Sequence, residues 1–253
     1  MNKIFENEEI VIYSEPSLDI INDSIVDNTI KKLNEYRKIF KKEKLAKLTV
    51  KFYDNLETYQ EDYRCILSVE PPQYSKGWFD SENGNIYLHM NLEMLSKYKN
   101  YPLFWDQQVS CIAHEAFHYY YYLYYYGEDR ITWFDEGTAQ YISGEIASYT
   151  EYSWYKLFID FIANYKAIDN LNERENGNSD VPDNLIFRRV NVFDGYAASL
   201  LAIKYLFDTK GEDHVYDIMF DNNRIREEGK DILNRMISYF NEVYSEYLQI
   251  KKS

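Results

Sequence analysis

The spacing of apolar and polar residues predicts one helix around which the rest of the chain is organised. Apolar residues follow helical spacing through Val109–Tyr126, and two histidines lie within this stretch. Gly127 can end the helix, and the polar residues 128–130 can turn the chain before a second helical pattern begins near Trp133. We therefore expect two antiparallel helices between Val109 and Tyr141.

The first hundred residues show a mixed pattern of strands and helices. Alternating or short apolar runs predict strands at 10–13, 47–53, 77–79 and 85–89, with residues 81–84 as the turn between the last two. Helical spacing runs from Ser17 or Asp19 to Lys42, and Asp54 can cap a short helix that ends near Tyr63.

Beyond Tyr141 the pattern is mostly helical. Apolar periodicity predicts helices at about 133–148, 151–169, 195–208, 212–219 and 228–249. Residues 170–184 are polar, contain Gly177 and Pro182, and are predicted as a loop that is either a lid or a plain connector. We expect an α+β protein with an N-terminal α/β subdomain at 1–104 and a helical subdomain at 105–253.

Composition narrows the classes of function. The chain has 253 residues, a hydrophobic content of 45% and a formal net charge of −14. Its acidity disfavours nucleic acid and anionic membranes as partners. It has two cysteines, its first residues do not resemble a signal peptide, and no apolar run is long enough to span a bilayer. These features predict a cytoplasmic protein.

The predicted central helix carries a pattern that suits a metal ion. It reads His114-Glu115-Ala116-Phe117-His118, which is H-E-x-x-H. Positions i and i+4 lie on one helix face, about 6 Å apart along the axis, so both imidazoles can reach one ion. Zinc accepts neutral imidazole nitrogen at about 2.0–2.1 Å. Glu115 lies about 100° round the helix, where it can act as general base on a metal-activated water.

Two histidines do not complete a catalytic zinc site, which needs a third protein ligand. Glu136 is the best candidate, because it lies 18 residues after His118 and belongs to the second helical pattern. Two antiparallel helices can bring its carboxylate back beside the histidines. The competing interpretation is a helix whose histidines are only packed polar residues.

These two motifs together resemble those of the gluzincin metallopeptidases, the clan of thermolysin and aminopeptidase N. The pattern W-x-x-E-G-x-A that follows H-E-x-x-H in the clan is present as Trp133-Phe134-Asp135-Glu136-Gly137-Thr138-Ala139. The chain looks most like compact bacterial peptidase-MA-like domains. The likeness is strong over about residues 105–145, looser over 190–250, and limited to the order of elements before that.

The resemblance implies a thermolysin-like catalytic domain, in which a small mixed sheet has an edge strand over the zinc helix and a mostly helical half follows. It assigns His114, His118 and Glu136 as ligands of Zn²⁺ and Glu115 as the general base. Residues 194–200 resemble the clan's later helix, whose tyrosine stabilises the oxyanion, and Tyr196 would take that role. Asp135 and Gln140 are candidates to orient the histidines.

The resemblance also predicts where a peptide substrate binds. In the clan, an extended substrate pairs with the edge strand of the sheet, and the candidate here is Asn85, Ile86, Tyr87 and Leu88, with a plain hairpin as the alternative. Aminopeptidases of the clan carry G-x-M-E-N at this point, and its glutamate holds the free amine. Residues 84–88 contain no acidic residue, which favours internal cleavage over aminopeptidase action.

Several other polar residues have simpler interpretations. Cys111 lies one turn before the first histidine and is expected to be a small buried thiol rather than a ligand. His89 is close to the proposed substrate strand, although a single histidine on a strand is usually structural. Arg188 and Arg189 can bind a substrate carboxylate or form ordinary ion pairs in an acidic protein.

The favoured hypothesis is a zinc metallopeptidase that cleaves peptides or proteins internally. Two alternatives remain open: a zinc hydrolase acting on another amide or on an epoxide, and a catalytically silent peptide-binding module of the same fold. The presence of Glu115 weighs against the silent module, because a protein that only binds peptides does not need a general base.

Overall fold

The alternating residues of the N-terminal part form a five-stranded mixed sheet. The computed structural model describes residues 1–18, 23–71, 77–98, 100–126, 131–164 and 192–250. The strands are β1 (Asn2–Glu6), β2 (Ile10–Ser14), β3 (Leu48–Tyr53), β4 (Gly77–Asp80) and β5 (Asn85–His89). Their order is β1-β2-β3-β5-β4, with β2, β3 and β5 parallel and the two outer strands antiparallel to their neighbours.

Strand β5 is an inner strand, so the prediction that its backbone pairs with a substrate is wrong. Asn85–His89 pair with Thr49–Tyr53 on one side, and Asn85–Leu88 pair with Asp80–Gly77 on the other. The turn at 81–84 was predicted correctly, and Gly84 adopts φ +65 there. A hairpin pattern does not reveal which of its strands meets a third one, and here the edge strand is β4.

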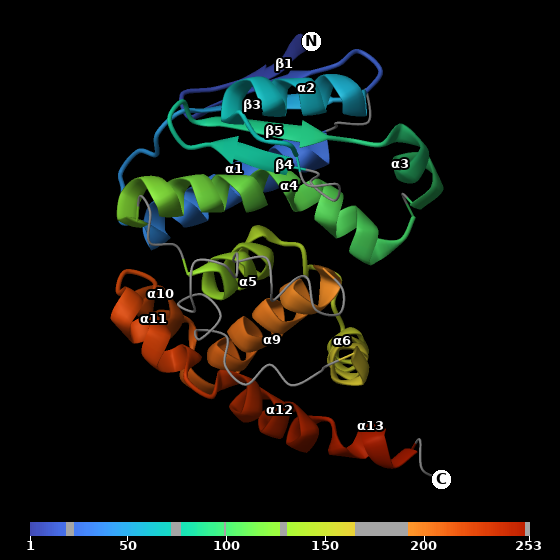
Figure 1. Ribbon diagram of the computed structural model, residues 1–253, viewed down its shortest axis with the longest axis vertical. Coiled ribbons are helices and arrows are strands. Elements are labelled where there is room, and N and C mark those ends of the chain that lie inside the picture. Colours follow the sequence, from blue (N-terminus) through green and yellow to red (C-terminus); the bar gives the residue numbers. More distant parts are fainter. Residues whose placement is uncertain (19–22, 72–76, 99, 127–130, 165–191, 251–253) are drawn as a thin grey trace. The chain divides into compact units, whose positions relative to one another are not determined.

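The helices of the N-terminal part lie on both faces of this sheet (Figure 1). Helix α2 (Leu56–Leu67) covers one face, and α1 (Asp23–Ile39) and α4 (Pro102–Tyr121) lie on the other. Helix α3 (Leu92–Tyr98) precedes α4, which continues as the π-helix η1 (Tyr122–Tyr126). The cap of helix α2 is Asn55, whose side chain accepts a hydrogen bond from the Thr58 amide. The prediction of Asp54 as the cap is therefore wrong by one residue.

Side-chain alternation gives the two faces of the sheet different roles. On one face Trp78 stacks on Tyr87 with ring centroids 4.0 Å apart. Tyr59 of α2 belongs to the same buried cluster. On the other face a Cβ atom at Gly77 would lie 2.6 Å from Oε1 of Glu115 on α4. Helices α2 and α4 therefore cover opposite faces, and the H-E-x-x-H helix packs against β4 and β5.

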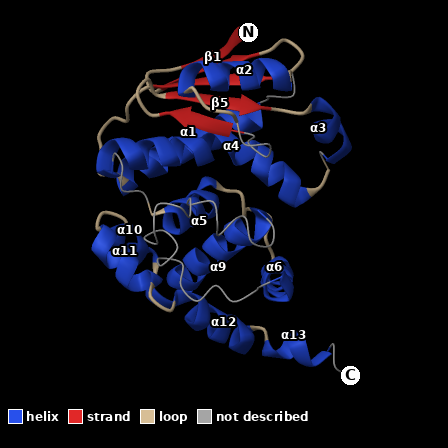
Figure 2. Cartoon of the chain, viewed as in Figure 1, coloured by secondary structure: helices blue, strands red, loops and turns tan. Residues whose placement is uncertain are grey.

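The C-terminal part is helical in every region that the structure describes (Figure 2). Its elements are α5 (Thr132–Ser143), α6 (Glu151–Asn164), α9 (Val192–Lys210), α10 (Glu212–Ile218), α11 (Asn222–Gly229), α12 (Ile232–Val243) and α13 (Ser245–Ile250). Helix α9 packs with α6, α10 and α12. The predicted α+β fold, with a small mixed sheet followed by a helical half, is confirmed.

Contacts divide the chain into two units, the first comprising residues 1–127 and 142–148 and the second the remainder. This division differs from the predicted boundary at residue 104, because α4 packs on the sheet and on α1. The last two residues of α5 belong to the first unit and the rest of that helix to the second. In the described ranges no helix combines the length and the apolar character needed to cross a bilayer.

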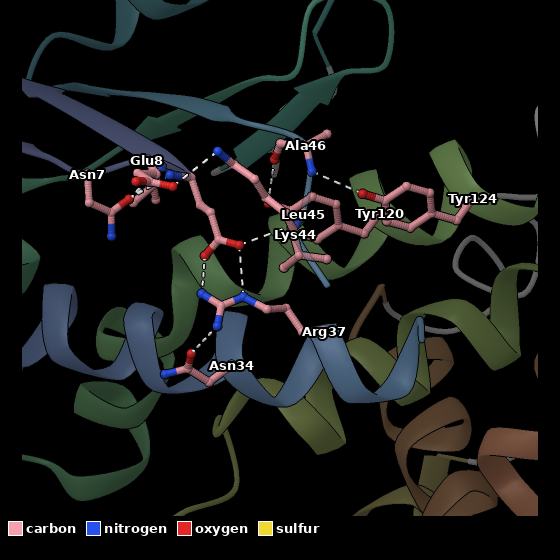
Figure 3. A network of polar contacts seen from close by, with 11 residues as sticks. Asn7, Glu8, Asn34, Arg37, Lys44, Leu45, Ala46, Tyr120 and Tyr124 are labelled. Carbon is pink, nitrogen blue, oxygen red and sulfur yellow. Dashed lines mark hydrogen bonds and ion pairs between the residues drawn. The ribbon is translucent and has the colours of Figure 1, made fainter. Parts of the chain in front are cut away.

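A polar network fastens the end of α4 to the start of β3 (Figure 3). The Tyr120 hydroxyl donates to the Ala46 carbonyl at 2.9 Å, and the Ala46 amide donates to the Tyr124 hydroxyl at 3.0 Å. Beside them Glu9, which is 6% exposed, accepts from Nε of Arg37 at 2.8 Å and from the Leu45 amide at 3.2 Å. The network joins the β1–β2 turn, α1 and α4.

We expect Arg37→Ala to lower the free energy of unfolding by about 1–3 kcal/mol, since it leaves a buried carboxylate without its charged partner. Hydrogen bonding from Arg37 lowers the pKa of the Glu9 carboxyl. The contribution of the pair is therefore complete above the pKa of an unfolded glutamate, about 4.3, and is lost as the pH falls through the folded-state pKa.

Urea unfolding of both proteins between pH 3 and pH 7 measures this contribution. Lys38→Ala is the matched control, because Lys38 is the exposed next residue of the same helix. An equal effect of the two substitutions, or a difference from wild type that grows toward low pH, would contradict the assignment.

Candidate metal centre

Helix α4 holds the H-E-x-x-H residues in a buried and firmly anchored position. It begins with Pro102, which suits the first turn of a helix, and runs for 20 residues. Ala113, Ala116 and Phe117 are fully buried, so most of the helix circumference near the motif faces protein. The apolar pattern predicted this burial.

Two side chains of α1 hold α4 by its backbone carbonyls. The Tyr36 hydroxyl donates to the carbonyl of Ala113, the residue before the first histidine, at 2.9 Å. The Asn28 amide donates to the carbonyl of Val109 at 3.3 Å. Because Tyr36 is itself fully buried, these bonds fix both the height and the rotation of the helix against α1.

The two imidazoles converge as the sequence predicted. Nε2 of His114 and Nε2 of His118 lie 3.0 Å apart, and the ring planes are inclined at 79°. Two nitrogens bound tetrahedrally to zinc at about 2.0–2.1 Å would lie about 3.3 Å apart. The pair therefore fits a zinc ion with only a small adjustment of the rings.

The other ring nitrogen of His114 has an acidic partner that the sequence analysis missed. Nδ1 of His114 lies 2.6 Å from Oε1 of Glu145, and both side chains are largely buried, at 14% and 18% exposed. The residues predicted for this role were Asp135 and Gln140. Glu145 follows Gly144, whose φ of +105 is a position where glycine is favoured. The helix ends at Ser143, earlier than the predicted end at 148, and Gly144 inside the predicted helix was the available signal.

Glu115 points from the same helix toward the edge strand. A Cβ atom at Gly77 would lie 2.6 Å from Oε1 of Glu115, so the carboxylate occupies the space that a side chain on this strand would need. Two residues along β4, the Phe79 ring packs near the His118 ring with centroids 6.2 Å apart. The edge strand thus runs past both the predicted base and a predicted ligand.

Glu136 lies on α5 and is 9% exposed. In the part of the chain that the structure describes, His114, His118 and Glu136 are the group of ligand side chains that can hold a metal ion. Tyr196 lies on α9, which begins at Val192 rather than near Gly195, and its side chain is half-buried. Its catalytic role stays a prediction.

The remaining candidates are outside this group or outside the described residues. Cys111 is a free cysteine, and burial raises the pKa of its thiol, which disfavours the thiolate that binds metals. His89 shares a sheet face with Tyr87 and packs against Tyr59, on the face opposite α4. The predicted loop at 170–184 and both Arg188 and Arg189 lie outside the described residues.

No model of a known protein family matches the chain, and no curated protein matches it either. The gluzincin resemblance therefore rests on the motifs at 114–118 and 133–139 and on the looser likeness after residue 190.

Proposed function

We propose that this protein is a zinc metallopeptidase that hydrolyses internal peptide bonds, with Glu115 as the general base. The convergence of Nε2 of His114 and Nε2 of His118 at 3.0 Å is the observation that carries the proposal. Glu115 supports it, since it projects from the same helix toward the edge of the sheet. A helix that used these histidines only for packing would have no need to bring their two Nε2 atoms together.

The third ligand of the proposal is Glu136, and chain connectivity supports it. The Asn28 amide donates both to the carbonyl of Val109 on α4 and to the carbonyl of Ser143 at the end of α5. These two carbonyls therefore lie close together within the first unit. Glu136 is seven residues before Ser143 on the same helix.

The register of an antiparallel pair then brings the three ligands to one level. If α5 runs antiparallel to α4, as the sequence predicts, seven residues back along α5 correspond to seven residues forward along α4. The position forward of Val109 by that number is Ala116, midway between His114 and His118. Glu136 would therefore lie at the level of the two imidazoles along the helix axis.

The chemistry divides between the metal and the protein. A bound zinc ion would lower the pKa of a water molecule and polarise the scissile carbonyl. Glu115 accepts a proton from the attacking water while the oxygen bonds to the carbonyl carbon, and it then delivers that proton to the leaving amine as the C–N bond breaks. In the proposal the Tyr196 hydroxyl donates a hydrogen bond to the oxygen on which negative charge develops.

In this proposal the substrate pairs with β4 rather than with the predicted strand β5. In the part of the sheet that the structure describes, β4 has one neighbour, and its Gly77 and Phe79 lie over α4. An extended peptide added to this edge by main-chain hydrogen bonds would pass close to Glu115. Backbone pairing depends little on side chains, which suits a protein or peptide substrate.

Internal cleavage remains the preferred mode with the edge at β4. An aminopeptidase needs an acidic group that is available to the free amine of its substrate. Asp80 is the acid on this strand, but its carboxylate accepts bonds from the Glu82 amide at 3.0 Å and from Nδ2 of Asn83 at 2.8 Å. It also lies on the face opposite α4 and is 6% exposed.

A cytoplasmic site of action belongs to the same proposal. Cys65 and Cys111 are both free, which is typical of proteins in a reducing compartment. The net charge of −14 argues against nucleic acid and anionic membranes as partners.

The wild-type protein should bind close to one zinc ion per chain, and His118→Ala should lose stoichiometric zinc, because one of three protein ligands is removed. Elemental analysis after dialysis against a weak chelator gives the ratio. His89→Ala is the control, since this histidine packs on the other face of the sheet and should leave the zinc content unchanged. Wild-type protein that takes up no zinc on reconstitution would contradict the metal site.

Glu115→Gln should retain zinc and fold but reduce kcat by about 10²–10⁴, because the nearly isosteric amide cannot accept the proton. Hydrolysis of an internally quenched peptide by zinc-loaded protein measures the rate. Glu93→Gln on α3 is the control, an exposed acid of the same unit. Equal activity of Glu115→Gln and the wild type would remove Glu115 from the mechanism.

Gly77→Ala should lower kcat while leaving the zinc content unchanged. The added Cβ would lie 2.6 Å from both Oε1 of Glu115 and Cδ2 of Leu88, so the carboxylate must move. Displacement of a catalytic group by about 1 Å can cost about 10²-fold in rate. Measured in the Glu115→Gln background, the same substitution should cause little further loss, and fully additive losses would show that Gly77 acts independently of Glu115.

A further inference from the structure

We propose that Glu145 is a positioning residue that orients His114 and sets its tautomer for metal binding, an inference that rests on the metal site proposed above. Neither the H-E-x-x-H motif nor the motif around Glu136 contains this residue. The observation that carries the inference is the 2.6 Å separation between Nδ1 of His114 and Oε1 of Glu145. Both residues belong to the first unit.

The chemistry of imidazole explains why this contact matters. A neutral histidine has one protonated nitrogen and one lone pair, and only the lone pair can bind a metal ion. The Glu145 carboxylate lies at ion-pair distance from Nδ1, 2.6 Å away, and its negative charge favours the tautomer that carries the proton on Nδ1 and the lone pair on Nε2. Nε2 of His114 is the atom that meets Nε2 of His118 at 3.0 Å. The carboxylate also raises the basicity of the ring as a ligand.

Glu145 acts on the histidine rather than on the ion. Nδ1 and Nε2 lie on different sides of the imidazole ring, so a carboxylate in contact with Nδ1 is directed away from an ion at Nε2. The described ligand group consists of His114, His118 and Glu136 and does not include Glu145. Glu145 is therefore a partner of a ligand and not itself a ligand.

The end of α5 is built to bring Glu145 to this place. The helix stops at Ser143, and Gly144 turns the chain with φ +105, a region that other residues rarely adopt. The Asn28 amide holds the Ser143 carbonyl at 3.4 Å and the Val109 carbonyl at 3.3 Å. These two bonds hold Ser143, just before Glu145, close to Val109, one and a half turns before His114. The backbone position of Glu145 relative to the His114 ring is therefore restrained.

A second bond holds the segment that follows. The Ser148 amide donates to Oδ2 of Asp106 on α4 at 2.6 Å. The short segment that carries Glu145 is therefore fastened to α4 at both ends, by Asn28 before it and by Asp106 after it. This arrangement resembles the support that a metal ligand needs, in which the partner of the ligand is itself held in place.

The experiment compares Glu145→Gln and Glu145→Ala in the full chain. Zinc affinity is measured by competition with a chromophoric chelator, the Co²⁺-substituted proteins are examined by visible absorption, and melting of the metal-free proteins is followed by circular dichroism. Glu93→Gln is the control for loss of one negative charge in the same unit. Zinc and Co²⁺ are the only probes, so no substrate has to be known.

Glu145→Ala should weaken zinc binding by about 10–100-fold, as removal of such partners usually does. It should also shift the Co²⁺ absorption bands, because the orientation of one ligand is no longer fixed. Glu145→Gln should lose less affinity and keep a spectrum close to that of the wild type, since its amide oxygen can still accept the Nδ1 proton. The control should match the wild type in all three measurements.

Two results would overturn the inference while leaving the metal site intact. One is wild-type affinity in both variants. The other is an equal loss in both variants together with an equal fall in metal-free melting temperature, which would make Glu145 a structural residue. Failure of the proposed function looks different, because the wild-type protein itself would then bind neither zinc nor Co²⁺.

Discussion

Because α4 is buried, every polar side chain near its middle needs a bonding partner. Phe117 and the alanines beside the histidines are fully buried, and His118 is 4% exposed. A polar group removed from water without a partner costs a few kcal/mol, about 1–3 in mutational data. The helix can therefore carry histidines here only if their ring nitrogens are satisfied. In the first unit the Glu145 carboxylate brings a negative charge to within 2.6 Å of Nδ1 of His114, and a metal ion would satisfy the two Nε2 atoms.

Close approach of the sheet to this helix depends on residues without bulky side chains. Gly77 leaves room for Glu115, and a Cβ atom at Gly84 would lie 2.9 Å from the Tyr119 hydroxyl. On the opposite face, stacking of Trp78 on Tyr87 stiffens the same hairpin. One face of β4 is thus held by the stacking of Trp78, and the other face, with Gly77, lies beside Glu115.

The tyrosines of this chain show why residue type alone is weak evidence for catalysis. The sequence contains 27 of them. Tyr36 and Tyr120 each donate a hydrogen bond to a backbone carbonyl, and Tyr124 accepts one from a backbone amide. Several buried hydroxyls therefore serve to hold helices and strands together. A catalytic role for Tyr196 therefore depends on its surrounding motif. The chain is also rich in acidic residues, so a functional role for any glutamate likewise needs evidence from its surroundings.

The sequence by itself determined the features that depend on neighbouring residues. Helical spacing identified the buried helix with its two converging histidines, alternation identified β2 to β5, and the turn at 81–84 was evident from its residues. Strand order was decided only by the tertiary structure, because main-chain pairing joins segments that are distant in sequence and leaves no local pattern. Glu145 was hidden for a similar reason. It is one of 42 acidic residues, and only the turn at Gly144 and the two bonds of the Asn28 amide bring its carboxylate to His114.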